Sequence, residues 1–119
     1  MPMSQFDEIV TSLRGRSPQH VVDWALERYE RQCAISFSGA EDVMLIDLAK
    51  KSGHPFSVFC LDTGRLHAET YEFIERVRQH YEIEIDLIWP QPEDVRDLVR
   101  KKGLFSFYAD GHDECCAIR

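Results

Sequence analysis

Two apolar segments are each followed by a short turn and a helical pattern, and this repeat constrains the fold more than any other feature. The first unit is Cys33–Phe37, an apolar run typical of a buried parallel strand, with a Ser-Gly turn and a helix expected over Glu41–Lys51 that stops at Gly53. The second is Phe56–Leu61, an Asp-Thr-Gly turn and a helix expected over His67–Tyr81. Strands that alternate with helices predict right-handed crossovers and a parallel sheet, hence an α/β fold.

The segments around these units fit the same architecture. A helix is expected over Gln5–Leu13. A second helix is expected from Pro18, with Ser17 as its N-cap, to about Tyr29. The strand expected over Ile83–Trp89 alternates apolar and acidic residues, which is typical of a strand near an edge or exposed on one face. A helix from Pro92 to about Lys102 and a short helix from Asp113 complete the pattern. The sequence predicts one domain or a part of one over residues 1–119, with two leading helices and a sheet that lacks its further strands.

Composition and charge exclude several classes of function. The chain has 119 residues, 44% of them hydrophobic, which suffices for one modest core. Its formal net charge of −7 argues against a nucleic-acid-binding protein. We expect a cytoplasmic protein without membrane attachment, because no apolar run reaches roughly 18 residues and the first residues do not resemble a signal peptide. In such a compartment the four cysteines serve packing, metal binding or redox chemistry rather than disulfides.

Two loops qualify as a ligand site by position, because open parallel sheets bind ligands outside the carboxyl ends of their strands. The loop 36–42 offers small residues, hydroxyl groups and a helix N-terminus, which suit an anion. The loop 61–65 adds the positive charge of Arg65.

Each loop also has a purely structural interpretation. Ser38 caps a helix and Gly39 eases a tight turn. Asp62 either holds its turn through an Asx hydrogen bond or orients ligand hydroxyls, and His67 is either solvated at a helix start or part of the site.

The adjacent cysteines near the end of the chain are chemically unusual. Cys115 and Cys116 cannot easily form a disulfide with each other, since their Cα atoms are only about 3.8 Å apart. Consecutive helical thiolates can instead reach one iron–sulfur cluster, which then needs two more ligands. Cys33 and Cys60 fall in expected strands and suit small buried apolar positions. Spacing alone leaves open whether the pair binds a cluster or simply packs in a helix.

Three motifs give the sequence a resemblance to a known family: ISFSGAEDV (35–43), LDTGRLHAETY (61–71) and KGLFSFYADGHDECCAIR (102–119). Over essentially its whole length the chain resembles the N-terminal half of the assimilatory adenylyl-sulfate reductases, relatives of the phosphoadenylyl-sulfate reductases. The resemblance implies an α/β fold related to the adenine nucleotide alpha-hydrolases, with flanking helices and a sheet incomplete in this chain. It also implies thioredoxin-dependent reduction of adenylyl sulfate to sulfite and AMP in sulfate assimilation, which supplies cysteine biosynthesis.

The resemblance also assigns roles to individual residues. Substrate-binding roles pass by position to Ser36, Phe37, Ser38, Gly39, Leu61, Asp62, Thr63, Gly64, Arg65 and Arg119. Cys115 and Cys116 match the first pair of ligands of the [4Fe–4S] cluster that marks the adenylyl-sulfate branch. The other two ligands and the nucleophilic cysteine are expected beyond Arg119. The chain is therefore expected to have no catalytic residue, to be inactive alone and to hold an incomplete cluster or none.

Other interpretations remain open. One is that the parent protein is a phosphoadenylyl-sulfate reductase or an ATP pyrophosphatase that shares the nucleotide loop. Another is that the chain is a non-catalytic module that binds AMP or adenylyl sulfate and covers its unfinished sheet by forming a homo-oligomer. A third is a folded remnant without activity.

Overall fold

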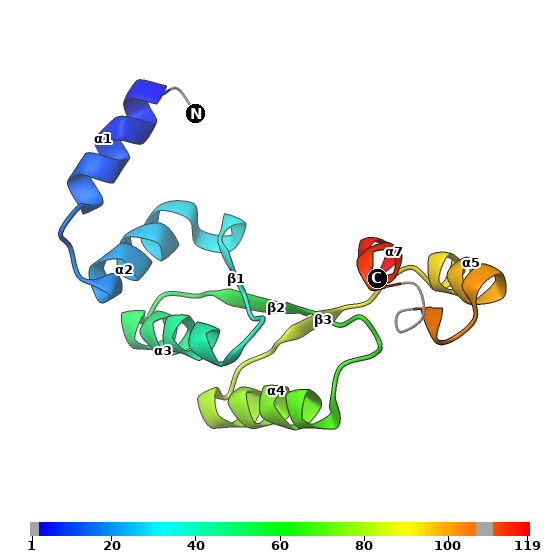
Figure 1. The fold of residues 1–119 in the computed structure, drawn as a ribbon. Helices are drawn as coiled ribbons and strands as arrows, with labels where there is room; N and C mark the ends of the chain where they lie inside the picture. Colours follow the sequence, from blue (N-terminus) through cyan, green and yellow to red (C-terminus); the bar gives the residue numbers. More distant parts are fainter. Residues whose placement is uncertain (1–2, 107–110) are drawn as a thin grey trace. The chain divides into compact units, whose positions relative to one another are not determined.

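The computed structural model describes residues 3–106 and 111–119. The chain divides into two compact units, Met1–Val58 and Phe59–Arg119, and each is described by itself. The strands form a three-stranded sheet in the order β1-β2-β3, with helices between them in the chain (Figure 1). The predicted α/β fold with a parallel sheet and flanking helices is confirmed.

The first compact unit contains two leading helices, followed by one strand and the helix after it. Its elements are α1 (Met3–Leu13), α2 (Pro18–Tyr29), a 3₁₀ turn (Glu30–Gln32), β1 (Ala34–Ser36), a second 3₁₀ turn (Ala40–Asp42) and α3 (Val43–Ser52). The predicted cap of α2 is confirmed, because the hydroxyl of Ser17 accepts the N–H of His20 at 3.2 Å. α2 packs against α3, and Gln19 Nε2 donates to the carbonyl of Leu48 at 2.9 Å.

The first strand differs from its prediction. A strand is confirmed within 33–37, but β1 has only three residues, and the expected burial is wrong because Ala34 and Ser36 are exposed. Because side chains of a strand alternate between two faces, these two share a face that is left to water, while Phe37 just after the strand is buried. Cys33 precedes the strand and is only half-buried, so the buried strand position expected for it is also wrong.

The helix after β1 begins later than expected. The 3₁₀ turn over Ala40–Asp42 precedes α3, which starts at Val43 rather than at Glu41. Its predicted end is confirmed: Gly53 has φ 75°, a left-handed conformation that favours glycine. Ile46 and Ala49 form the buried side of α3.

The second unit carries the parallel strand pair. Its elements are β2 (Ser57–Leu61, which starts at the unit boundary), α4 (Ala68–Tyr81), β3 (Asp86–Ile88), α5 (Pro92–Lys102) and α7 (Asp113–Ile118). β2 and β3 run parallel, with Leu61 opposite Ile88. β3 is an edge strand as predicted, although it is shorter than the expected range 83–89. The predicted start of the short helix at Asp113 is confirmed.

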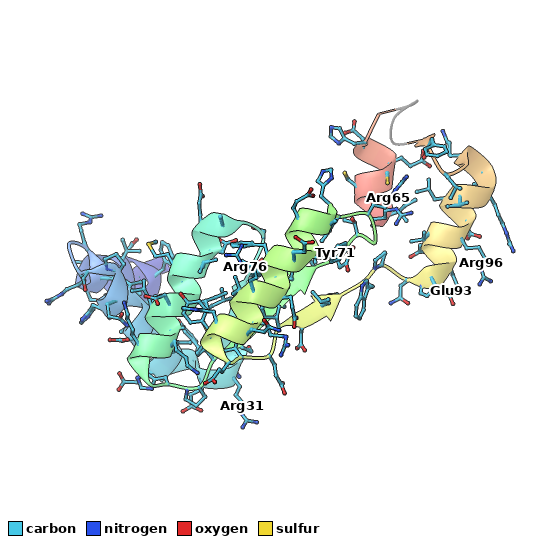
Figure 2. The ribbon with its side chains drawn as sticks, turned by 90° about the horizontal axis from the view of Figure 1, so that it is seen from below. Arg31, Arg65, Tyr71, Arg76, Glu93 and Arg96 are labelled. Carbon is cyan, nitrogen blue, oxygen red and sulfur yellow. The ribbon has the colours of Figure 1, made fainter. Side chains whose placement is uncertain are left out.

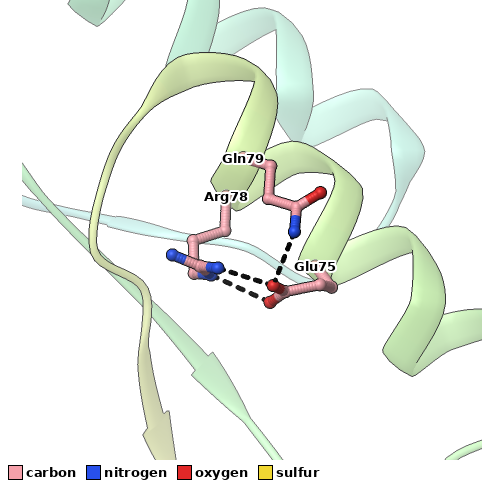
Figure 3. Close-up of polar contacts among 3 residues, drawn as sticks. All are labelled: Glu75, Arg78 and Gln79. Atoms are coloured by element: carbon pink, nitrogen blue, oxygen red, sulfur yellow. Dashed lines mark hydrogen bonds and ion pairs between the residues drawn. The ribbon is translucent and has the colours of Figure 1, made fainter.

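The helix α4 has one buried and one exposed side. Ile74 and Val77 are buried, whereas Glu75, Arg78 and Gln79 lie on the surface and contact one another. Arg78 Nε donates to Glu75 Oε2 at 2.8 Å, and Gln79 Nε2 donates to Glu75 Oε1 at 3.1 Å (Figure 3). Exposed pairs of this kind contribute little, typically well under 1 kcal/mol. The packing of the buried side therefore fixes α4.

The last helices of the unit lie against each other. Lys102 Nζ at the end of α5 pairs with Glu114 Oε2 of α7 at 3.4 Å, and Leu98 and Cys115 are buried. Residues 107–110 of the motif KGLFSFYADGHDECCAIR lie outside the described residues. Of the helices in the described ranges, none combines the length and the apolar character needed to cross a membrane.

Candidate functional site

Asp62 lies at the centre of the loop that follows β2. Only 4% of its surface is exposed, yet it is an ionisable residue. Its Oδ1 accepts the hydroxyl of Tyr71 at 2.7 Å and the N–H of Gly64 at 2.8 Å. Its Oδ2 accepts the indole N–H of Trp89 at 2.9 Å, and its own N–H donates to the carbonyl of Ile88 at 2.9 Å. This carboxylate thus ties together the loop, α4 and the residue after β3.

These hydrogen bonds keep the carboxylate ionised. Burial by itself raises the pKa of Asp62, but the bonds from Tyr71, Gly64 and Trp89 outweigh it and hold the pKa below its ordinary value. The bond to the same carboxylate raises the pKa of the Tyr71 hydroxyl. Burial, and then the nearby charge of Asp62, raise the pKa of the Cys60 thiol, so Cys60 is suited to packing and not to nucleophilic chemistry. The Asx turn predicted for Asp62 is confirmed by its bond to Gly64.

The remainder of the loop contacts the last residue of the chain. Arg119 Nη1 donates to the carbonyl of Thr63 at 2.6 Å, and the N–H of Arg65 donates to Thr63 Oγ1 at 3.2 Å. Gly64 has φ 80°, and a Cβ built there lies 3.4 Å from Arg119 Nη1. Arg65 precedes α4, with its side chain exposed (Figure 2).

The second unit therefore brings together six of the ten residues assigned to substrate binding. They are Leu61, Asp62, Thr63, Gly64, Arg65 and Arg119. Their substrate contacts stay a prediction. The Nε of Arg119 is buried and has no hydrogen-bond partner among the described residues, so this guanidinium retains an unused donor. His67 is the N-cap of α4 but makes no side-chain capping bond.

The loop after β1, in the first unit, is closed by its own aspartate. Asp42 Oδ2 accepts the N–H of Ser38 at 2.7 Å, the Ser38 hydroxyl at 2.9 Å and the N–H of Gly39 at 3.1 Å. Hydrogen bonds from Ser38 lower the pKa of Asp42. The donors that the sequence offered to an anion thus already bind a carboxylate. Gly39, and not Ser38, is the N-cap residue of the following turn.

Two more predicted residues of this loop differ in what they can present to a ligand. Phe37 is 2% exposed, so it presents almost no surface to a ligand. Ser36 is exposed at the end of β1. Their role in substrate binding stays a prediction.

The adjacent cysteines lie on α7 in different environments. Cys115 is buried, whereas Cys116 is exposed with its Sγ 3.8 Å from His112 Nδ1. Across residues 3–106 and 111–119, no three His, Cys, Asp or Glu side chains form a group that suits a metal ion. A [4Fe–4S] cluster needs four ligands, usually cysteines. The described residues do not fit a complete cluster site.

Three contacts of these loops were missed by sequence reasoning. The sequence places Tyr71 only in the helix expected over 67–81 and Trp89 only at the end of the strand expected over 83–89, yet both donate hydrogen bonds to Asp62. Asp42 was included in the first loop without its bonds to Ser38. A usable signal for Trp89 was its position: it follows β3 as Asp62 follows β2, and these strands are parallel neighbours.

A separate pocket in the first unit contains none of the predicted site residues. It has a volume of about 420 Å³. The residues that line it are Leu26, Glu27, Glu30, Arg31, His54 and Pro55. It opens at the end of α2.

Comparison with known proteins assigns the chain to a family. The chain belongs to the family described as the phosphoadenosine phosphosulfate reductase domain, which matches residues 32–119. It is 54% identical over 121 aligned residues to adenosine 5'-phosphosulfate reductase of Pseudomonas aeruginosa (strain LESB58), covering 99% of this chain and 45% of that protein. It is 52% identical over 117 residues to chloroplastic 5'-adenylylsulfate reductase 1 of Arabidopsis thaliana, covering 98% of this chain and 25% of that protein. The chain thus spans less than half the length of these relatives.

Proposed function

We propose that the protein to which this chain belongs reduces adenylyl sulfate to sulfite and AMP in sulfate assimilation. The observation that carries the proposal is the loop 61–65: a turn held by a buried carboxylate at the end of a parallel strand. This turn lies in a sequence 54% identical to a protein named for that substrate. Such a loop presents exposed groups to a ligand while its own backbone stays fixed.

The reaction that we propose consumes two electrons, which are supplied by a dithiol. We propose that this dithiol is thioredoxin. A cysteine thiolate attacks the sulfur of adenylyl sulfate, an S–S bond forms, and AMP leaves with the electrons of the broken O–S bond. A thioredoxin thiolate then attacks the enzyme sulfur and expels sulfite, and the second thioredoxin thiol releases the enzyme thiol as a disulfide forms. We assign the nucleophile to a cysteine outside this chain and expect the chain alone to be inactive.

We assign Cys115 and Cys116 to one side of a [4Fe–4S] cluster in the complete protein. Their placement on consecutive positions of α7, in a chain similar to reductases of the adenylyl-sulfate type, supports this assignment. The chain supplies two of the four thiolates, and no chemical step is assigned to the cluster. A cytoplasmic location and a homo-oligomeric state also remain proposals. The Arabidopsis relatives are named chloroplastic, whereas the name of the Pseudomonas protein gives no compartment.

The test of this function uses the complete protein and thioredoxin. We expect sulfite release from adenylyl sulfate, and much slower release from the analogue that carries a 3'-phosphate. The unsubstituted complete protein (the parent protein) and the control variant Cys60→Ser should both contain bound iron. The iron content of Cys115→Ser should be much lower. Preference for the 3'-phosphorylated substrate by an iron-free parent protein would instead favour a phosphoadenylyl-sulfate reductase. If neither substrate yields sulfite, both reductase assignments are contradicted.

A further inference from the structure

Trp89 is an exposed aromatic side chain with a fixed orientation. Its exposed fraction is 61%, although tryptophan is usually largely buried. The indole N–H donates to Asp62 Oδ2 at 2.9 Å, so its polar atom is bound to a buried carboxylate. A ring tethered at one edge, with most of its surface exposed, is prepared to stack on a flat partner.

Trp89 lies at the edge of the sheet where open parallel sheets bind their ligands. Leu61 and Ile88 are paired in the parallel strands β2 and β3, and Asp62 and Trp89 are the next residue of each chain segment. Because side chains alternate along a strand, Asp62 and Trp89 extend to the same side, in agreement with their hydrogen bond. Both follow the carboxyl ends of their strands, where open parallel sheets bind ligands.

We propose that the indole of Trp89 is the surface on which the adenine ring of the nucleotide stacks. The inference rests on the proposed function, which makes an adenine nucleotide the ligand. A purine is a flat partner of similar size, and stacking of a base on an aromatic side chain strengthens binding by roughly ten- to a hundredfold. Trp89 is a binding residue in this proposal, and Asp62 is the residue that positions it.

The first arm of the test compares AMP with ribose 5-phosphate, which lacks the base, by calorimetry on the complete protein. Trp89→Leu should bind AMP roughly ten- to a hundredfold more weakly and ribose 5-phosphate as before. Trp89→Phe, which keeps a ring but lacks the N–H, should stay within a few-fold of the parent protein. An unchanged AMP affinity in Trp89→Leu, or an equal loss for both ligands, overturns the proposal.

The second arm does not depend on the stability of a Leu variant. Added AMP should quench tryptophan fluorescence in the parent protein and in the control Trp24→Phe, which lacks a tryptophan of the first unit. The quenching should fall sharply in Trp89→Phe. Equal quenching in the parent protein and in Trp89→Phe overturns the stacking proposal while leaving the reductase function intact. A parent protein that does not bind AMP at all overturns the proposed function as well.

Discussion

Replacing Asp62 by asparagine tests whether the buried carboxylate holds the loop. The substitution keeps the size of the side chain but exchanges one acceptor oxygen for an NH₂ donor. If the amide oxygen faces Tyr71 and Gly64, the NH₂ group faces the indole N–H of Trp89, and two donors meet. In the opposite orientation, two donors lose their acceptor. Neither arrangement satisfies all three partners.

The size of the effect follows from these bonds. A buried donor left without an acceptor costs about 1–3 kcal/mol, and hydrogen bonds to a charged group are stronger than those to a neutral amide. Asp62→Asn should therefore lower the free energy of unfolding at neutral pH by about 2–4 kcal/mol. The control is Asp47→Asn, which makes the same chemical change in a surface pair with Lys51 at 2.8 Å. That variant should lose less than about 0.5 kcal/mol.

The pH dependence gives an independent test with a definite sign. The pKa of Asp62 in the folded protein lies below the ordinary value of 3.8, so its carboxylate binds fewer protons when folded than when unfolded. The stabilisation is present above the unfolded pKa and is lost as the pH falls through the lower folded pKa. The difference between the parent protein and Asp62→Asn should therefore shrink in acid.

Urea unfolding, followed by circular dichroism from neutral to acid pH, measures both effects. The reasoning is refuted if Asp62→Asn loses no more stability than Asp47→Asn at neutral pH. It is also refuted if the difference from the parent protein stays constant as the pH is lowered below 3.8.

The other predictions concern the two loops. Gly64→Ala and Gly53→Ala should each lower the free energy of unfolding by about 1 kcal/mol, because both have positive φ, and the Cβ added at Gly64 makes only an ordinary contact of 3.4 Å with Arg119 Nη1; a much larger loss for Gly64→Ala in urea unfolding would contradict this. Asp42→Ala should speed amide hydrogen exchange at residues 38 and 39, while the neighbouring Glu41→Ala should not; equal rates in both variants would argue against the role of the carboxylate.

The elements predicted from the sequence were those whose ends depend on local chemistry. Ser17 and Pro18 begin α2, and Gly53 ends α3, because a capping hydroxyl, a fixed φ and a left-handed glycine each act within a few residues. The apolar run 33–37 predicts a buried strand because the sequence does not show what covers each face. Ala34 and Ser36 are exposed, and burial of a strand depends on elements distant in sequence.

The hydrogen bonds of Asp62 also divide into local bonds, which the sequence predicts, and distant bonds, which it does not. The bond from Gly64 spans two residues and could be predicted as an Asx turn, whereas those from Tyr71 and Trp89 span 9 and 27 residues. The distant bonds change what the loop can do. They occupy Oδ1 and Oδ2 of Asp62 with protein donors, so its capacity to accept ligand hydroxyls is already largely used. A ligand at this edge would then meet groups that the network leaves exposed, among them the side chains of Trp89, Leu61 and Arg65. Asp62 would act on such a ligand through the orientation that it imposes on Trp89.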